Sequence, residues 1–117
     1  MAKKQTKAVV ERYFRESTPR ISRNAVLYRL RVMLSKMTGR PMSDMRSTTP
    51  LGSGRDASGS IPGLLFDTPG KKALAKPINR DFALYGVKVT MGETGAAETI
   101  GDLHKLVWKK IPEKHRK

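Results

Sequence analysis

The feature that most constrains this chain is a single apolar repeat with the period of an α-helix. After Ser22, apolar residues recur every three or four positions, which places them on one face of a helix. The repeat consists of Val26, Leu27, Leu30, Met33, Leu34 and Met37. Ser22 is a residue type that caps helix N-termini, and Gly39 is one that ends helices. The repeat therefore predicts a long amphipathic helix that must pack against other apolar faces.

A second helix is predicted after residues 67–68. Asp67 or Thr68 can cap it, and Pro69 suits the first helical position because that position needs no N–H group. Its apolar face consists of Leu74, Ile78 and Phe82, with Tyr85 as a further candidate. Pro77 lies inside the segment and should kink it or split it into two short helices.

The last predicted helix begins at a capping box, Thr99-Ile100-Gly101-Asp102, and Pro112 ends it. Its inner face consists of Leu103, Leu106, Val107 and Ile111. Trp108 lies beside this face, and we expect it at the rim of the core or exposed to a partner. Between the two helices, residues 87–89 are an extended piece too short for a sheet, and residues 91–97 are predicted as a loop.

The remaining segments complete the predicted domain organisation. Residues 41–63 are rich in Gly, Ser, Thr and Pro and predict a long loop, in which Leu51 and Ile61 are the residues able to bury. Residues 1–20 are a basic extension with a short helix expected over 5–17, and residues 113–117 are a basic tail. The single domain is residues 21–112. We expect an all-α fold, a small bundle of three to four helices with one long Gly/Ser-rich loop.

Positive charge is concentrated towards both ends of the chain. Residues 1–40 hold eleven Lys/Arg and two acids, and residues 103–117 hold six and one, within a formal net charge of +14. The middle is nearly neutral. This pattern favours a surface that faces a polyanion, although solvated basic ends would give the same pattern.

Without cysteine, a secretory signal or an apolar run long enough to span a membrane, we expect a cytoplasmic protein with no membrane partner.

The sequence argues against an enzyme. It has two histidines, His104 and His115, and no carboxylate is placed by local spacing to orient either one. No metal-ligand spacing accompanies them, so we expect no metal site. The glycines around Gly63 and Gly70 do not have the spacing of a phosphate-binding loop.

The order of features resembles that of acyl carrier proteins over about residues 22–112. The resemblance rests on a long first helix, a long loop with Thr49-Pro50-Leu51-Gly52, a helix after Asp67-Thr68, then Phe82 and Gly86-Val87-Lys88-Val89 before Thr99-Ile100-Gly101-Asp102-Leu103. In that family a serine at the start of the second helix carries phosphopantetheine. The matching position here is Thr68, whose β-branched hydroxyl is more hindered.

The resemblance implies a helical bundle, and this chain departs from the family in the charge of the second helix. Carrier proteins present acidic residues there, whereas this chain has Lys71, Lys72, Lys76 and Arg80. We therefore expect no cofactor, with phosphopantetheine on Thr68 as the one alternative; Ser58 is a second hydroxyl, less well placed. The candidate partner-binding residues are Arg23, Arg29, Arg31, Lys71, Lys72, Lys76, Arg80, Lys109 and Lys110.

The sequence leaves two main candidate functions. A third, weaker candidate is an atypical carrier modified at Thr68 or Ser58. The first is a non-enzymatic binding module that engages an acidic protein or another polyanion. The second is a nucleic-acid-binding protein that acts through its basic termini. Zinc-finger, paired-aromatic and heptad signatures of nucleic-acid binding are missing from the sequence, so the charge alone supports the second.

Overall fold

A computed structural model describes residues 18–117 of the chain, and the helix expected over 5–17 lies outside the described residues. Within 18–117 the fold is helical, and its β-type pairing is limited to isolated bridges. The helices are α2 (Arg23–Thr38), α3 (Thr68–Ala73), α4 (Ala75–Asp81), α5 (Met91–Ala96) and α6 (Ile100–Lys110). Short 3₁₀ turns follow at Met42–Asp44, Ala83–Tyr85 and Glu113–His115. The all-α prediction is confirmed for the described residues.

The helix α2 begins and ends where the sequence predicts. The Ser22 hydroxyl accepts a hydrogen bond from the Ala25 N–H at 3.1 Å, and Gly39 adopts a left-handed φ of 73° while its N–H donates to Ser35. The inner face is shorter than predicted. Met37 is 49% exposed, because it lies in the last turn, beyond the part of α2 that packs on the core.

Pro77 splits the second predicted helix, as expected. Helix α3 ends at Ala73, four residues before Pro77, because the proline has no N–H for the Ala73 carbonyl and its ring would clash with that carbonyl. Of the two candidate caps, Asp67 is the N-cap: its carboxylate accepts from the Gly70 N–H at 2.7 Å. Thr68 is therefore the first helical residue rather than the cap.

The prediction of a loop over residues 91–97 is wrong, because this segment forms α5. Thr90 and Glu93 make a capping box in which each side chain accepts a hydrogen bond from the other residue's N–H. The sequence signal was therefore present, but the segment has no apolar stripe. Thr94 is fully buried and donates to the Lys72 carbonyl at 3.2 Å, which attaches α5 to α3.

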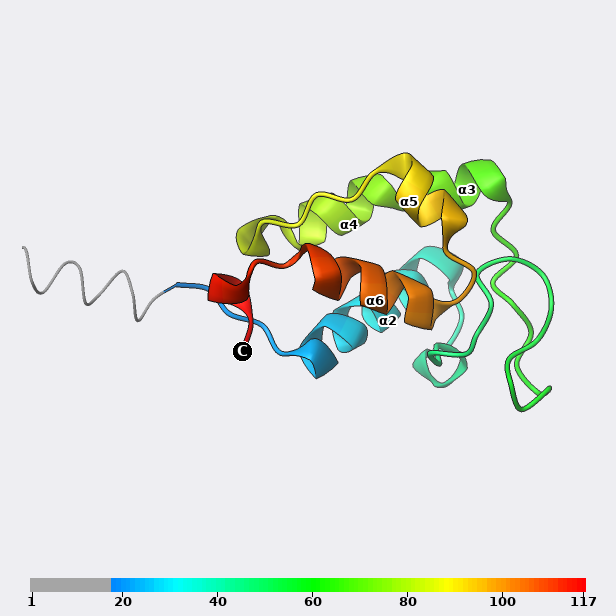
Figure 1. The fold of residues 1–117 in the computed structure, drawn as a ribbon. Coiled ribbons are helices and arrows are strands. Elements are labelled where there is room, and N and C mark those ends of the chain that lie inside the picture. The colour runs from blue at the N-terminus through cyan, green and yellow to red at the C-terminus, as the bar shows by residue number, and fades with distance from the viewer. Residues whose placement is uncertain (1–17) are drawn as a thin grey trace, which may run out of the picture.

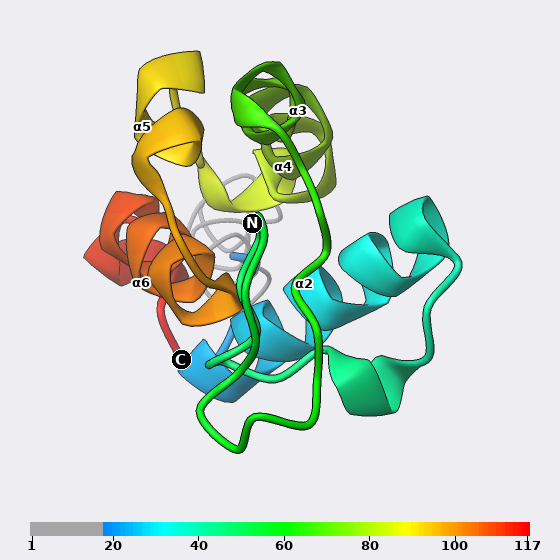
Figure 2. The same cartoon turned by 90° about the vertical axis from the view of Figure 1, so that its right-hand side faces the viewer.

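The helices form two layers around one core (Figures 1 and 2). Helices α3, α4 and α5 lie on one side, and α2 and α6 lie on the other. Leu30, Phe82 and Val107, one from each predicted segment, are fully buried in the same apolar cluster. Burial of one such side chain is worth about 1.5–3 kcal/mol, so this shared core is what holds the layers together.

The long segment between α2 and α3 is attached to the core by backbone hydrogen bonds. Leu51 N–H donates to Glu98, Ile100 N–H donates to Thr49, and Gly101 N–H donates to Ser47, at 2.8–3.1 Å. Both Leu51 and Ile61 are buried. The segment therefore runs across the start of α6 and covers one end of the core (Figure 2).

Candidate interaction surface

The carboxylates of the described residues are mostly engaged within the fold. Asp67, Glu93 and Asp102 each accept backbone N–H groups at helix starts, and Asp44 pairs with Arg40 at 3.1 Å. Such caps and short pairs stabilise the ionised carboxylates within the fold. With a formal net charge of +14, the field around the molecule is positive.

Asp56 is the most enclosed of these carboxylates, with a side chain 1% exposed. The Ile61 N–H donates to its Oδ1 at 3.0 Å and holds the pKa of Asp56 below its ordinary value. The Ser58 hydroxyl and the Arg46 guanidinium, 3.7 Å away, lower this pKa further, whereas burial opposes them. The carboxylate organises the tip of the 54–63 loop and offers no free acid to a ligand.

Three of the predicted binding residues instead support the fold. Arg31 donates to the Met42 carbonyl and Lys71 to the Ala97 carbonyl, both at 3.0 Å. Lys110 pairs with Glu93 at 2.8 Å, and this contact, with the Thr90 N–H, lowers the pKa of Glu93. These three cations join neighbouring segments, which the linear sequence did not indicate.

Three others form an exposed row along α3 and α4, which we call the basic ridge: Lys72, Lys76 and Arg80. Leu74 keeps helical angles between the two helices (φ −64°, ψ −20°), so the four-residue spacing places these side chains on successive turns. Arg80 lies 3.5 Å from Asp81, whereas the ammonium groups of Lys72 and Lys76 have no hydrogen-bond or ion-pair partner among residues 18–117.

The other predicted cations lie apart from the ridge. Arg29 is exposed, and its guanidinium lies over the Tyr85 ring at 5.6 Å. Arg23 begins α2, and Lys109 is exposed in the last turn of α6, where a cation also offsets the helix dipole. The structure thus distributes the nine predicted residues over more than one face.

The two termini of the described chain lie together. Ile21 and Arg116 form a parallel bridge: the Ile21 N–H donates to His115 at 2.9 Å and the Lys117 N–H donates to Ile21 at 3.0 Å. Figure 1 shows the C-terminus beside the segment that leads into α2. This junction places Arg20 and the exposed Lys114 and Lys117 at one end of the molecule.

The histidines make structural contacts. His104 Nε2 lies 2.7 Å from the Arg23 carbonyl, and His115 Nδ1 lies 2.7 Å from the Pro19 carbonyl. A carbonyl only accepts, so in each ring the nitrogen named carries the proton. Burial lowers the pKa of His104. Residues 18–117 bring together no group of three or more side chains able to hold a metal ion.

The two hydroxyls considered for a prosthetic group differ in their surroundings. Thr68 is exposed at the first position of α3. Ser58 contacts both Asp56 oxygens at 2.8 and 2.9 Å and the Ser60 hydroxyl at 2.6 Å. Both residues are exposed, and they differ in that the Ser58 hydroxyl is held by Asp56 and Ser60.

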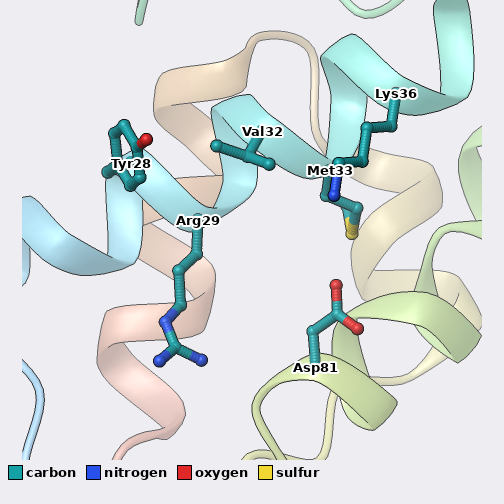
Figure 3. A pocket seen from close by; sticks show the side chains of 6 residues that line it. All are labelled: Tyr28, Arg29, Val32, Met33, Lys36 and Asp81. Atoms are coloured by element: carbon teal, nitrogen blue, oxygen red, sulfur yellow. The ribbon is translucent and has the colours of Figure 1, made fainter.

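A groove with a volume of about 280 Å³ lies between α2 and α4. Figure 3 shows Tyr28, Val32 and Met33 along α2, with Arg29 and Lys36 extending from the same helix and Asp81 facing them from α4. Tyr28 is 60% exposed, which is unusual for a large aromatic side chain. Tyr28 was not among the predicted binding residues, and the four-residue spacing of Tyr28, Val32 and Lys36 was the available signal.

Arg40 joins two segments that are distant in the sequence. Its guanidinium donates to Asp44 Oδ2, to the Gly63 carbonyl at 2.7 Å and to the Pro62 carbonyl at 2.8 Å. It holds the end of α2 to the 54–63 loop. Asp44 lies four residues away, but the two loop partners are backbone oxygens more than twenty residues away, which no sequence pattern indicates.

None of the described helices is long and apolar enough to cross a membrane. No protein-family model, no curated protein and no solved structure matches this chain. The function is therefore inferred from the residues and their geometry.

Proposed function

We propose that this chain is a non-enzymatic binding protein that engages an acidic protein surface, or another polyanion, through exposed cations. One observation carries this proposal: the carboxylates are mostly engaged in caps and pairs, while the ammonium groups of Lys72 and Lys76 on the basic ridge have no hydrogen-bond or ion-pair partner among the described residues. Complementary charge steers such a partner to the surface and sets its orientation.

The proposal includes a divergent bundle of the acyl-carrier type without a prosthetic arm. Support comes from the order of the elements: a long α2, a long connection, a helix starting at Asp67-Thr68, the short α5 and the final α6. The threonine and the basic ridge stand where carriers have a serine and acidic residues. Both differences favour a partner other than the enzymes that modify carriers.

Intact mass spectrometry after co-expression with a phosphopantetheinyl transferase tests the missing arm. We expect an unchanged mass. A gain of about 340 Da, the mass of the arm, that disappears in Thr68→Ala would instead establish a carrier.

Fluorescence anisotropy with labelled polyglutamate tests the surface. We expect Lys72→Gln/Lys76→Gln to weaken binding by about tenfold and to reduce its salt dependence, since two charge contacts are lost. Lys88→Gln/Lys105→Gln is the matched control, because it removes the same charge from exposed positions off the ridge. Equal losses in both variants would show that net charge, and not this surface, determines binding.

A second candidate function is nucleic-acid binding, favoured by the terminal junction. The Ile21–Arg116 bridge brings Arg20, Lys114 and Lys117 together at the point where the basic residues 1–17 join the fold. We expect duplex DNA binding that falls steeply with salt, with a log–log slope reduced by about two in Lys114→Gln/Lys117→Gln. Failure to retard any nucleic acid at low salt would remove this candidate.

A further inference from the structure

The groove between α2 and α4 combines an apolar wall with a charged rim. Tyr28 and Val32 lie one turn apart on α2, and Met33, 7% exposed, joins this wall to the core. Arg29 and Lys36, both exposed, extend along the rim, and Asp81 stands opposite (Figure 3). The apolar surface is therefore accessible, and it lies between cations.

The size of the groove limits what it can hold. Small-molecule and cofactor sites usually measure about 300–1,000 Å³ and enclose most of their ligand. This groove measures about 280 Å³ and is open along α2. It has room for one or two apolar side chains that project from a longer partner, rather than for an enclosed ligand.

The residue types fit a protein partner. Tyr and Arg are the residues that most often dominate protein–protein contacts, and here Tyr28 and Arg29 are adjacent at one end of the groove. Arg29 is oriented by its contact with the Tyr85 ring, so less side-chain freedom is lost when it binds a carboxylate. Lys36, two helical turns away, can reach a second carboxylate.

The charges of the rim favour an acidic partner, and the apolar wall favours a peptide side chain over a phosphate backbone. The rim carries two cations and one carboxylate, and the chain as a whole has a net charge of +14. Asp81, whose ion-pair partner is its neighbour Arg80 at 3.5 Å, repels any anion, but its carboxylate can accept an N–H group of a peptide backbone.

We propose that this groove binds an acidic peptide segment of a partner protein, seating an apolar side chain against Tyr28 and Val32 while flanking carboxylates pair with Arg29 and Lys36. The inference rests on the proposed binding function. It adds a second contact surface beside the basic ridge and specifies an acidic peptide as the ligand of that surface. Contact at two surfaces would orient the partner across α4, which carries both Asp81 and two residues of the ridge.

Selection from a displayed library of random 12-residue peptides on the full chain tests the proposal. We expect enriched peptides to contain a Leu, Phe or Trp flanked by at least two Asp or Glu residues. The two strongest peptides are then synthesised with a fluorescent label and measured by anisotropy. Tyr28→Ser/Lys36→Gln should weaken their binding by at least about tenfold, and Lys105→Gln should change it by less than about twofold. Both altered positions of the groove variant are exposed, and its circular dichroism spectrum and Tm verify its fold.

The outcomes separate this inference from the proposed function. Enriched peptides without carboxylates, no enrichment, or binding unchanged in the groove variant would overturn the groove as the site. If acidic peptides bind but lose affinity only in Lys72→Gln/Lys76→Gln, the binding function stands and the groove proposal fails. If oligo(dT) displaces the peptides from the wild-type chain, and if its own binding is lost in the Tyr28→Ser/Lys36→Gln variant, the groove binds nucleobases by stacking and the proposal is overturned.

Discussion

Gly63 is the position where one added methyl group should disturb the fold most. A Cβ there would overlap the carbonyl oxygen of Gly52 and lie 3.1 Å from that carbonyl carbon and 3.2 Å from the Pro50 Cβ. These contacts are backbone or proline atoms, which cannot rotate away. Gly63→Ala therefore forces the two passes of the 50–66 loop apart.

The loss in the free energy of unfolding follows from the hydrogen bonds that this separation strains. Gly63 N–H donates to Gly54, Leu64 N–H to Pro50 and Leu65 N–H to Gly52, at 2.8–3.0 Å. Each backbone hydrogen bond contributes about 1 kcal/mol net, and overpacking typically costs about 1–3 kcal/mol. We expect a loss of about 2–4 kcal/mol in the free energy of unfolding and a fall in Tm of at least about 8 °C.

Urea unfolding followed by Trp108 fluorescence and by circular dichroism measures this loss as a lower midpoint at an unchanged m-value. Gly92→Ala is the matched control: its Cβ would meet Thr90 Oγ1 at an ordinary 3.9 Å, and alanine favours the helix by up to about 1 kcal/mol. If Gly63→Ala proves as stable as Gly92→Ala, the close approach of the two loop passes is wrong.

Three further predictions concern side chains that hydrogen-bond to backbone groups. Burial lowers the folded-state pKa of His104, so the unfolded state takes up a proton more readily. We therefore expect Tm to be highest above about pH 6.5 and to fall towards pH 5. His104→Gln, which can still reach the Arg23 carbonyl, should reduce that fall in Tm. Thr90→Ala should destabilise by about 1 kcal/mol in thermal unfolding, because α5 loses its N-cap, whereas Thr90→Ser should restore it. Asn79 accepts from the Val89 N–H at 2.7 Å and donates to its carbonyl at 2.9 Å, so Asn79→Ala should cost about 1–3 kcal/mol in urea unfolding and speed amide exchange at Val89. Wild-type behaviour of His104→Gln, Thr90→Ala or Asn79→Ala would contradict the contact concerned.

The helix ends were predicted correctly where a cap or a proline lies next to an apolar repeat. Ser22 and Gly39 bound α2, Pro77 separates α3 from α4, and Thr99 starts α6. Helix α5 was predicted as a loop, since its capping box accompanies glycine and small residues rather than an apolar face. Met37 was assigned to the inner face by periodicity, which does not show where the packing partner of α2 ends.

The candidate site was harder to predict, because the availability of a cation depends on distant partners. Lys71 and Lys72 are neighbours with the same chemistry, yet the Lys71 ammonium donates to the Ala97 carbonyl while Lys72 lies exposed on the ridge. The α2–α4 groove likewise needs both helices in place before Tyr28 and Asp81 face one cavity. Neither fact is encoded in local spacing.

Local sequence was enough to predict the helical class, the ends of α2, the start of α6 and the excess of positive charge, because caps, prolines and apolar period act over three or four residues. Tertiary structure alone decided which cations remain exposed and where an accessible apolar wall lies between them. The physical reason is that hydrogen bonds and packing across 20 or more residues depend on how the layers meet, and this is set by the shared burial of Leu30, Phe82 and Val107.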